Sequence, residues 1–148
     1  MRTLFGVALL ALAIGTASAQ ERTVIRMPGS LEGLPFSSAV RVGNLIFLSG
    51  QIGLVPGTRT LAEGGAAGQT RQAMENIKAV VEYAGSSMNR MVKCTVFLRH
   101  IEDYAEVNEV YASFFRTEPP ARSAMAASGL ALDALVEIEC IALVGAAR

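Results

Sequence analysis

The chain has 148 residues, with 13 basic and 13 acidic side chains, so its formal charge is +0. That length suits one domain of ordinary size, and a hydrophobic share of 51% excludes an intrinsically disordered chain. A neutral chain without clusters of Lys and Arg gives no electrostatic reason to bind nucleic acid. We therefore predict one folded domain with no nucleic-acid partner.

The N-terminal segment has the composition of a secretory signal peptide. Arg2 supplies a short positive start, residues 4–14 are almost all apolar, and Ala17-Ser18-Ala19 gives small residues before a cleavage point. The apolar run is too short to span a bilayer comfortably. We predict a leader at Met1–Ala19, a domain at 20–148, and a periplasmic or secreted protein with no membrane contact after cleavage. An uncleaved anchor or an N-terminal strand is the alternative.

Strand patterns are short stretches of apolar or alternating residues bounded by turn formers. They cover residues 21–27, 39–42, 45–49, 91–99, 121–127 and 135–144. Gly43-Asn44 joins the second and third stretches as a two-residue hairpin turn. In residues 91–99, Val92, Cys94, Val96 and Leu98 are predicted to share one face.

Two segments have helical periodicity. In residues 66–84, Ala73 and Ile77 lie one helical turn apart on one face, and Gly85 is placed to cap the end. The second helix begins at Asp103, where Glu106 completes a pattern like a capping box, and runs to about residue 115. Its apolar stripe is predicted to be core: Tyr104, Val107, Val110, Tyr111 and Phe114. The double proline at 119–120 is expected to close the helix.

This order of elements predicts an α+β fold, in which a single-layer mixed sheet carries both helices on one face. The other face has apolar residues as well, among them Phe47, Phe97 and Ile141. Because the chain has no third helix to cover them, we expect self-association through the open face.

The two cysteines, Cys94 and Cys140, lie in apolar strand patterns. In an exported protein they can pair, for a gain of about 3 kcal/mol, and buried free thiols are the alternative. His100, the only histidine, follows a strand and is predicted to be a loop residue. No cluster of His, Cys and Asp has metal-ligand spacing, so we predict no metal site.

Arg122 follows the double proline and has small neighbours on both sides. Its planar guanidinium can bind a carboxylate with two parallel hydrogen bonds, although a solvated surface arginine is the commoner outcome. Glu137 lies inside an apolar strand, where an acid is paired, at an oligomer seam, or functional. With Ser49 and Asn108 as short polar groups, these residues suffice for a small acid substrate.

The segment Gly43 to Ile52 resembles the first signature of the RidA (YjgF/YER057c) family. Further similar segments follow in order: residues 69–72, 75–79, 92–98, 107–111, 119–123 and 136–139. The resemblance covers about residues 30–145. It implies a chorismate-mutase-like (YjgF-type) fold and a homotrimer with ligand clefts between subunits. It also implies cofactor-free hydrolysis of enamines and imines of amino acids, such as 2-aminoacrylate and 2-iminopropionate, to 2-oxo acids and ammonia.

The resemblance also implies roles for individual residues. Arg122 would clamp the substrate carboxylate, and Glu137 would orient or activate the attacking water. Ser49 and Asn108 would line the cleft, and backbone groups near Ala124 would help to hold the substrate.

Two positions depart from the family pattern. Phe36 occupies the position of a cleft tyrosine in active members, so a hydroxyl is missing. Ala124 replaces a cysteine of well-studied members. Phe36 and the leader favour an alternative, a non-catalytic trimeric protein that binds a small carboxylate in the periplasm. The RNA cleavage sometimes attached to the family's name fits poorly, because the chain is neutral and has one histidine.

Overall fold

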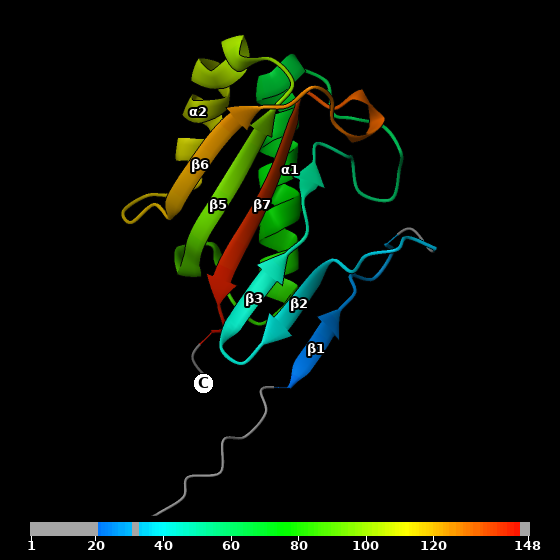
Figure 1. The fold of residues 1–148 in the computed structure, drawn as a ribbon, viewed down its shortest axis with the longest axis vertical. Helices are drawn as coiled ribbons and strands as arrows, with labels where there is room; N and C mark the ends of the chain where they lie inside the picture. The colour runs from blue at the N-terminus through cyan, green and yellow to red at the C-terminus, as the bar shows by residue number, and fades with distance from the viewer. Residues whose placement is uncertain (1–20, 31–32, 146–148) are drawn as a thin grey trace, which may run out of the picture.

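The computed structural model describes residues 21–30 and 33–145, and they form one seven-stranded sheet with two α-helices (Figure 1). The strands are β1 (Arg22–Ile25), β2 (Ala39–Val42), β3 (Leu45–Leu48), β4 (Gln51–Ile52), β5 (Met91–Leu98), β6 (Ala121–Ala126) and β7 (Val136–Leu143). The helices are α1 (Gly65–Tyr83) and α2 (Tyr104–Ala112), with short 3₁₀ turns at Met88–Arg90, Ile101–Asp103 and Ala131–Asp133. The predicted leader lies outside the described residues and stays a prediction.

The sheet is mixed, and its strand order is β1-β2-β3-β7-β5-β6, with β4 beside β7. β5 and β6 are parallel, whereas the other pairs are antiparallel. Both helices lie behind the sheet on one face (Figure 1). The predicted single layer with helices on one side is therefore confirmed, and β6 forms one edge of the sheet.

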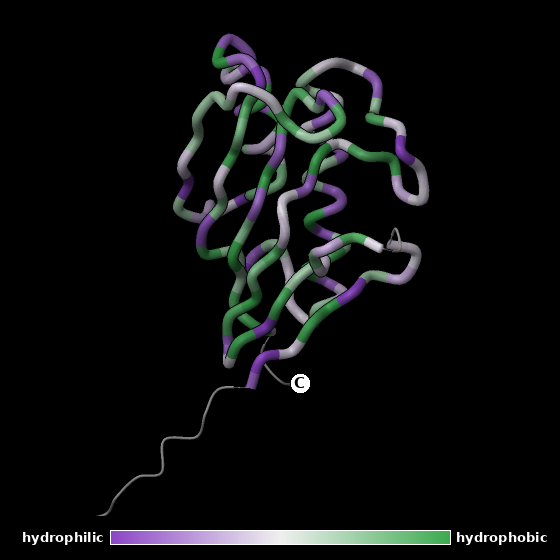
Figure 2. Tube along the Cα trace, turned by 45° about the vertical axis from the view of Figure 1, so that its right-hand side comes forward, coloured by the Kyte–Doolittle hydropathy of each residue, from purple (hydrophilic) through white to green (hydrophobic). Residues whose placement is uncertain are grey.

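The core lies between the sheet and α1. Met74, Ile77 and Val81 of α1 are fully buried against Ile46 and Ile138 of the sheet. Hydrophobic segments run along the central strands in Figure 2. Gly85 follows α1 with a φ of 80°, as a C-terminal cap requires, so the predicted helix end is confirmed.

The second helix differs from its prediction at both ends. Asp103 has helical backbone angles because a 3₁₀ turn leads into α2, so its side chain makes no capping hydrogen bond. At the other end, the hydroxyl of Ser113 donates to the carbonyl of Val110, and the helix stops at Ala112, well before the prolines. Tyr104 is 43% exposed, so its assignment to the core was wrong.

A bulge at the start of β5 changes the predicted face of one residue. Met91 pairs with Ala142, but Lys93 pairs with Ile141, so Val92 has no partner in the ladder. Val92 is 43% exposed, while Met91 takes a place in the core. Cys94, Val96 and Leu98 share the buried face as predicted.

Cys94 and Cys140 lie opposite each other on β5 and β7 and form a disulfide. The disulfide is buried in the core. Of the two alternatives, the structure has the paired cysteines. Within the described ranges, no helix combines the length and apolarity needed to cross a membrane.

Candidate active site

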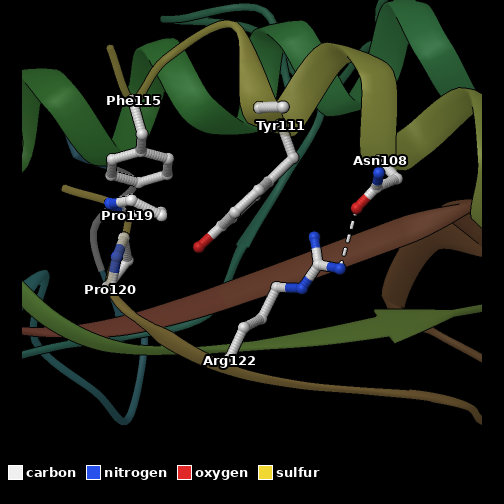
Figure 3. A pocket seen from close by; sticks show the side chains of 7 residues that line it. Asn108, Tyr111, Phe115, Pro119, Pro120 and Arg122 are labelled. Atoms are coloured by element: carbon white, nitrogen blue, oxygen red, sulfur yellow. Dashed lines mark hydrogen bonds between the residues drawn. The ribbon is translucent and has the colours of Figure 1, made fainter. Parts of the chain in front are cut away.

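Arg122 lies on the edge strand β6 and reaches across to α2. In the sheet it pairs with the buried Cys94, so its side chain is on the face that the helices cover. Its Nη2 donates to Oδ1 of Asn108 at 2.8 Å, drawn as a dashed line in Figure 3, and to the hydroxyl of Tyr104 at 2.9 Å. Two acceptors on one helix therefore orient the guanidinium.

Two aromatic rings complete this arrangement. The guanidinium carbon of Arg122 is 4.7 Å from the ring centroid of Tyr111 and 5.6 Å from that of Tyr104. Both distances are within the range of cation–π attraction. Tyr104, Asn108 and Tyr111 follow one another at steps of four and three residues, so they share a face of α2. We call these four residues the Arg122 cluster.

A cavity of about 280 Å³ opens beside the Arg122 cluster, between the end of α2 and the start of β6. Its lining consists of Asn108, Tyr111, Ala112, Phe115, Pro119, Pro120 and Arg122. Within residues 21–30 and 33–145, no acceptor bonds to Nε or Nη1 of Arg122. These donors, and the positive charge, are therefore available to an anionic ligand.

Tyr111 is only 4% exposed, and in the part of the chain that the structure describes its hydroxyl has no hydrogen-bond partner. Burial raises the pKa of Tyr111 to about 12, and the charge of Arg122 offsets part of that rise. The hydroxyl is thus neutral at physiological pH and can donate one hydrogen bond.

Glu137 lies on the opposite face of the sheet, beside the link between β3 and β4. A Cβ at Gly50 would collide with Oε1 of Glu137, so the absence of a side chain there makes room for the carboxylate. Burial raises the pKa of Glu137, and the neighbouring charge of Glu139 raises it further. A raised pKa brings a carboxylate closer to the range in which it exchanges protons near neutral pH.

Ser49 precedes Gly50, and its side chain forms a hydrogen bond to the loop before β2. Its hydroxyl donates to the carbonyl of Ser37 at 2.6 Å, which ties the preceding loop to the end of β3. Phe36, which precedes Ser37 in that loop, is 56% exposed. We call Glu137, Gly50 and Ser49 the Glu137 cluster.

The two clusters do not meet within one chain. In the strand register, Cys94 lies opposite both Arg122 and Cys140, so these residues share a face of the sheet. Glu137 comes three residues before Cys140 in β7 and therefore points to the other face. Strand spacing and rise place the Cα atoms of Arg122 and Glu137 about 14 Å apart.

Of the predicted site residues, the structure brings Arg122 and Asn108 together, and Ser49 lies near Glu137 through Gly50. Ala124 shares the face of Arg122 and packs against the core. Sequence reasoning missed Tyr104 and Tyr111, because tyrosines in an apolar stripe were assigned to the core. Their spacing around Asn108 was the signal that could have identified them.

A metal ion would need a group of acidic, histidine or cysteine side chains. No group of three or more such residues is arranged to hold one in the described ranges. The expectation that no cofactor is required stays a prediction.

The chain is similar in sequence to a described protein family and to proteins of known name. The family model described as Endoribonuclease L-PSP matches residues 31–144. The 2-iminobutanoate/2-iminopropanoate deaminase of Dermatophagoides farinae is 41% identical over 110 residues, which are 74% of this chain and 86% of that protein.

Solved structures of similar sequence have the same fold as this chain. The YjgF gene product of E. coli superimposes with a TM-score of 0.75 at 37% identity, over 82% of this chain and 98% of that one. E. coli TdcF with bound serine has a TM-score of 0.74 at 36% identity, with the same coverage of 82% and 98%. The observed fold is therefore the YjgF-type fold that the sequence resemblance implied.

Proposed function

Because the chain belongs to the YjgF/RidA family, we propose that it hydrolyses reactive 2-imino acids and their enamine tautomers to 2-oxo acids and ammonia. In this reaction the oxygen of water adds to C2 of the imine, the C–N bond breaks, and the nitrogen leaves as ammonia. The deaminase name of the Dermatophagoides relative supports this reaction class.

The observation that carries the proposal is the geometry of Arg122. Its guanidinium is oriented by Asn108 and Tyr104, yet Nε and Nη1 have no partner among the described residues. A 2-imino acid has one carboxylate next to the reacting carbon, and an oriented arginine binds such a group with charge-assisted hydrogen bonds. The serine bound to TdcF is also a small amino acid.

Glu137 is proposed as the group that orients the water and accepts its proton. Its raised pKa favours exchange of that proton with the departing nitrogen. Since Glu137 and Arg122 lie on opposite faces of one sheet, we propose that the full site forms between two copies of the chain. The Arg122 cluster of one subunit would then face the Glu137 cluster of the next.

The open face of the sheet supports this assembly, which we propose to be a homotrimer. Phe47, Val92 and Met125 are 42%, 43% and 48% exposed, and large apolar side chains at the surface commonly mark protein interfaces. Light scattering on the purified protein tests the proposal, which requires the mass of three chains. A monomer at micromolar concentration would contradict it.

We also propose that the protein is exported. The composition of residues 1–19 supports a leader, and the disulfide between Cys94 and Cys140 suits an oxidising compartment. Intact-mass measurement of the protein from the cell exterior or periplasm tests both features. We expect a chain that begins at Gln20 and carries no free thiol; a full-length chain recovered from the cytosol would contradict export.

The test of the proposed reaction is a coupled assay. An amino-acid oxidase generates imines from a panel of amino acids, and semicarbazide traps the imine that remains. We expect the protein to accelerate imine loss and Arg122→Ala to abolish the acceleration. The exposed Arg116 supplies the matched control, Arg116→Ala. No acceleration with any imine, from a protein of the correct mass, would refute the reaction.

A second candidate function is binding of a small carboxylate without turnover. It is favoured by the separation of Arg122 from Glu137 within one chain, because carboxylate recognition then needs only the Arg122 cluster. RNA cleavage has less support, since the formal charge is +0 and the one histidine, His100, is exposed. Carboxylate binding without imine hydrolysis would favour the second candidate.

A further inference from the structure

The cavity beside Arg122 has a charged end and a mostly apolar end. Asn108 and Arg122 supply polar groups at one end, whereas Phe115, Pro119 and Pro120 line the other end mainly with carbon (Figure 3). The Tyr111 hydroxyl is the one side-chain polar group beside the prolines in this lining. A ligand whose carboxylate reaches Arg122 would therefore have an apolar space immediately beside it.

Tyr111 adds a second observation that points to a ligand. In Figure 3 its ring lies between Arg122 and the two prolines, and its hydroxyl is directed toward the prolines and away from Asn108. That hydroxyl is buried and lacks a hydrogen-bond partner among the residues described. A buried, unsatisfied donor is unfavourable, and the π-face of an aromatic ring can accept a weak hydrogen bond from it. An aromatic occupant would therefore gain more from this hydroxyl than an aliphatic one.

The size of the cavity limits the class of ligand. Its volume of about 280 Å³ lies just below the range of roughly 300–1,000 Å³ found for drug-sized ligands. It is too small for a nucleotide or cofactor, but it can hold the side chain of a single amino acid.

We propose that this cavity receives the side chain of the substrate, so that the site selects 2-imino acids with bulky apolar side chains over the alanine-derived imine. The substrate class rests on the proposed function, but the preference for a bulky side chain does not require turnover. The carboxylate binds Nε and Nη1 of Arg122, and the side chain extends past Tyr111 toward Phe115 and the prolines. An aromatic ring there lies against carbon surface and presents its π-face to the Tyr111 hydroxyl.

Binding of the product 2-oxo acids tests this preference without catalysis. Calorimetry on the purified protein compares pyruvate, 4-methyl-2-oxopentanoate and phenylpyruvate, which share a carboxylate and differ in side chain. We expect phenylpyruvate to bind at least tenfold more tightly than pyruvate, with 4-methyl-2-oxopentanoate between them. Equal affinities in the wild-type protein would overturn the proposal.

Ala112→Phe fills the cavity from its rim. We expect it to bring the affinity ratio of phenylpyruvate to pyruvate close to one. Ala79→Phe, the same change at an exposed position of α1, is the control and should retain the wild-type ratio. An unchanged ratio in a folded Ala112→Phe protein would also overturn the proposal. If the binding preference holds but no imine is hydrolysed, the proposed reaction fails while the assignment of the cavity stands.

Discussion

The Arg122 cluster and the Glu137 cluster differ in how completely one chain builds them. Arg122 is bound by Asn108 and Tyr104 and lies against two aromatic rings. The carboxylate of Glu137 has no hydrogen bond within the described chain, and space for it comes from the glycine at position 50. The guanidinium of Arg122 is therefore oriented before any ligand binds, whereas the carboxylate of Glu137 has space but no hydrogen bond that fixes its position.

This difference separates the residues proposed to bind the substrate from the residue proposed to transfer protons. The proposed carboxylate recognition depends on α2 and β6, and the residues proposed for it all come from one chain. Glu137, the proposed proton acceptor, lies on the open face, where its position depends on what covers that face. Substitutions in the two clusters should therefore affect different kinetic parameters.

Glu137→Gln should have the largest effect. The amide has almost the same shape but cannot accept a proton, so we expect kcat to fall about 1,000-fold while KM stays within about twofold. Steady-state rates in the imine assay measure both parameters. Glu75→Gln, at an exposed position of α1, is the matched control. A matched loss in that control, or no loss in kcat, would remove Glu137 from the mechanism.

Arg122→Lys should have the next largest effect. The charge remains, but the planar fork that binds Asn108, Tyr104 and a carboxylate together is lost. We expect kcat/KM to fall about 100-fold, equivalent to about 2.7 kcal/mol, mainly through KM. Arg116→Lys should retain wild-type rates. A lysine variant with wild-type KM would show that the two-donor geometry is not used.

Gly50→Ala tests whether the glycine positions the carboxylate. The new methyl group collides with the end of a side chain and not with backbone, so Glu137 moves aside and the fold tolerates the change. We expect a fall of about tenfold in kcat, with a melting temperature within about 2 °C of wild type. Gly129→Ala, where no heavy atom lies within 4 Å of the added carbon, is the control. Unchanged kcat would show that the carboxylate does not need this space.

Tyr104→Phe should have a smaller effect. The ring stays, but one of the two acceptors that orient Arg122 is lost, at a cost of about 1 kcal/mol or roughly fivefold in KM. Tyr83→Phe, on the exposed side of α1, should change nothing. If Tyr104→Phe lowers kcat and leaves KM unchanged, then Tyr104 acts in the chemical step and not in orienting Arg122.

The smallest expected effect is a pH-dependent difference in stability. Burial raises the pKa of Glu137 above its ordinary 4.5, so the folded state holds the proton more tightly than the unfolded state. The resulting stabilisation is complete below that ordinary value and is lost as pH rises through the folded pKa. In urea unfolding from about pH 4 to 8, Glu137→Gln should therefore gain stability relative to wild type as pH rises. A difference that does not change with pH would contradict this.

Much of the fold was predictable because its signals are local. Alternating residues identified the strands, the four-residue steps around Ile77 identified α1, and Gly43-Asn44 identified the hairpin turn. Predictions failed where a neighbouring segment altered the local pattern. A 3₁₀ turn gave Asp103 helical angles, and a bulge removed Val92 from the core.

By itself the sequence determined which residue types the site contains, and the order of its motifs identified the family. Only the tertiary structure decided that Tyr104 and Tyr111 hold Arg122 and that an apolar cavity lies beside them. The same is true of the disulfide, because two cysteines 46 residues apart pair only when β5 and β7 are neighbours in register. These contacts join segments distant in the chain, and spacing along a sequence carries no information on which segments will meet.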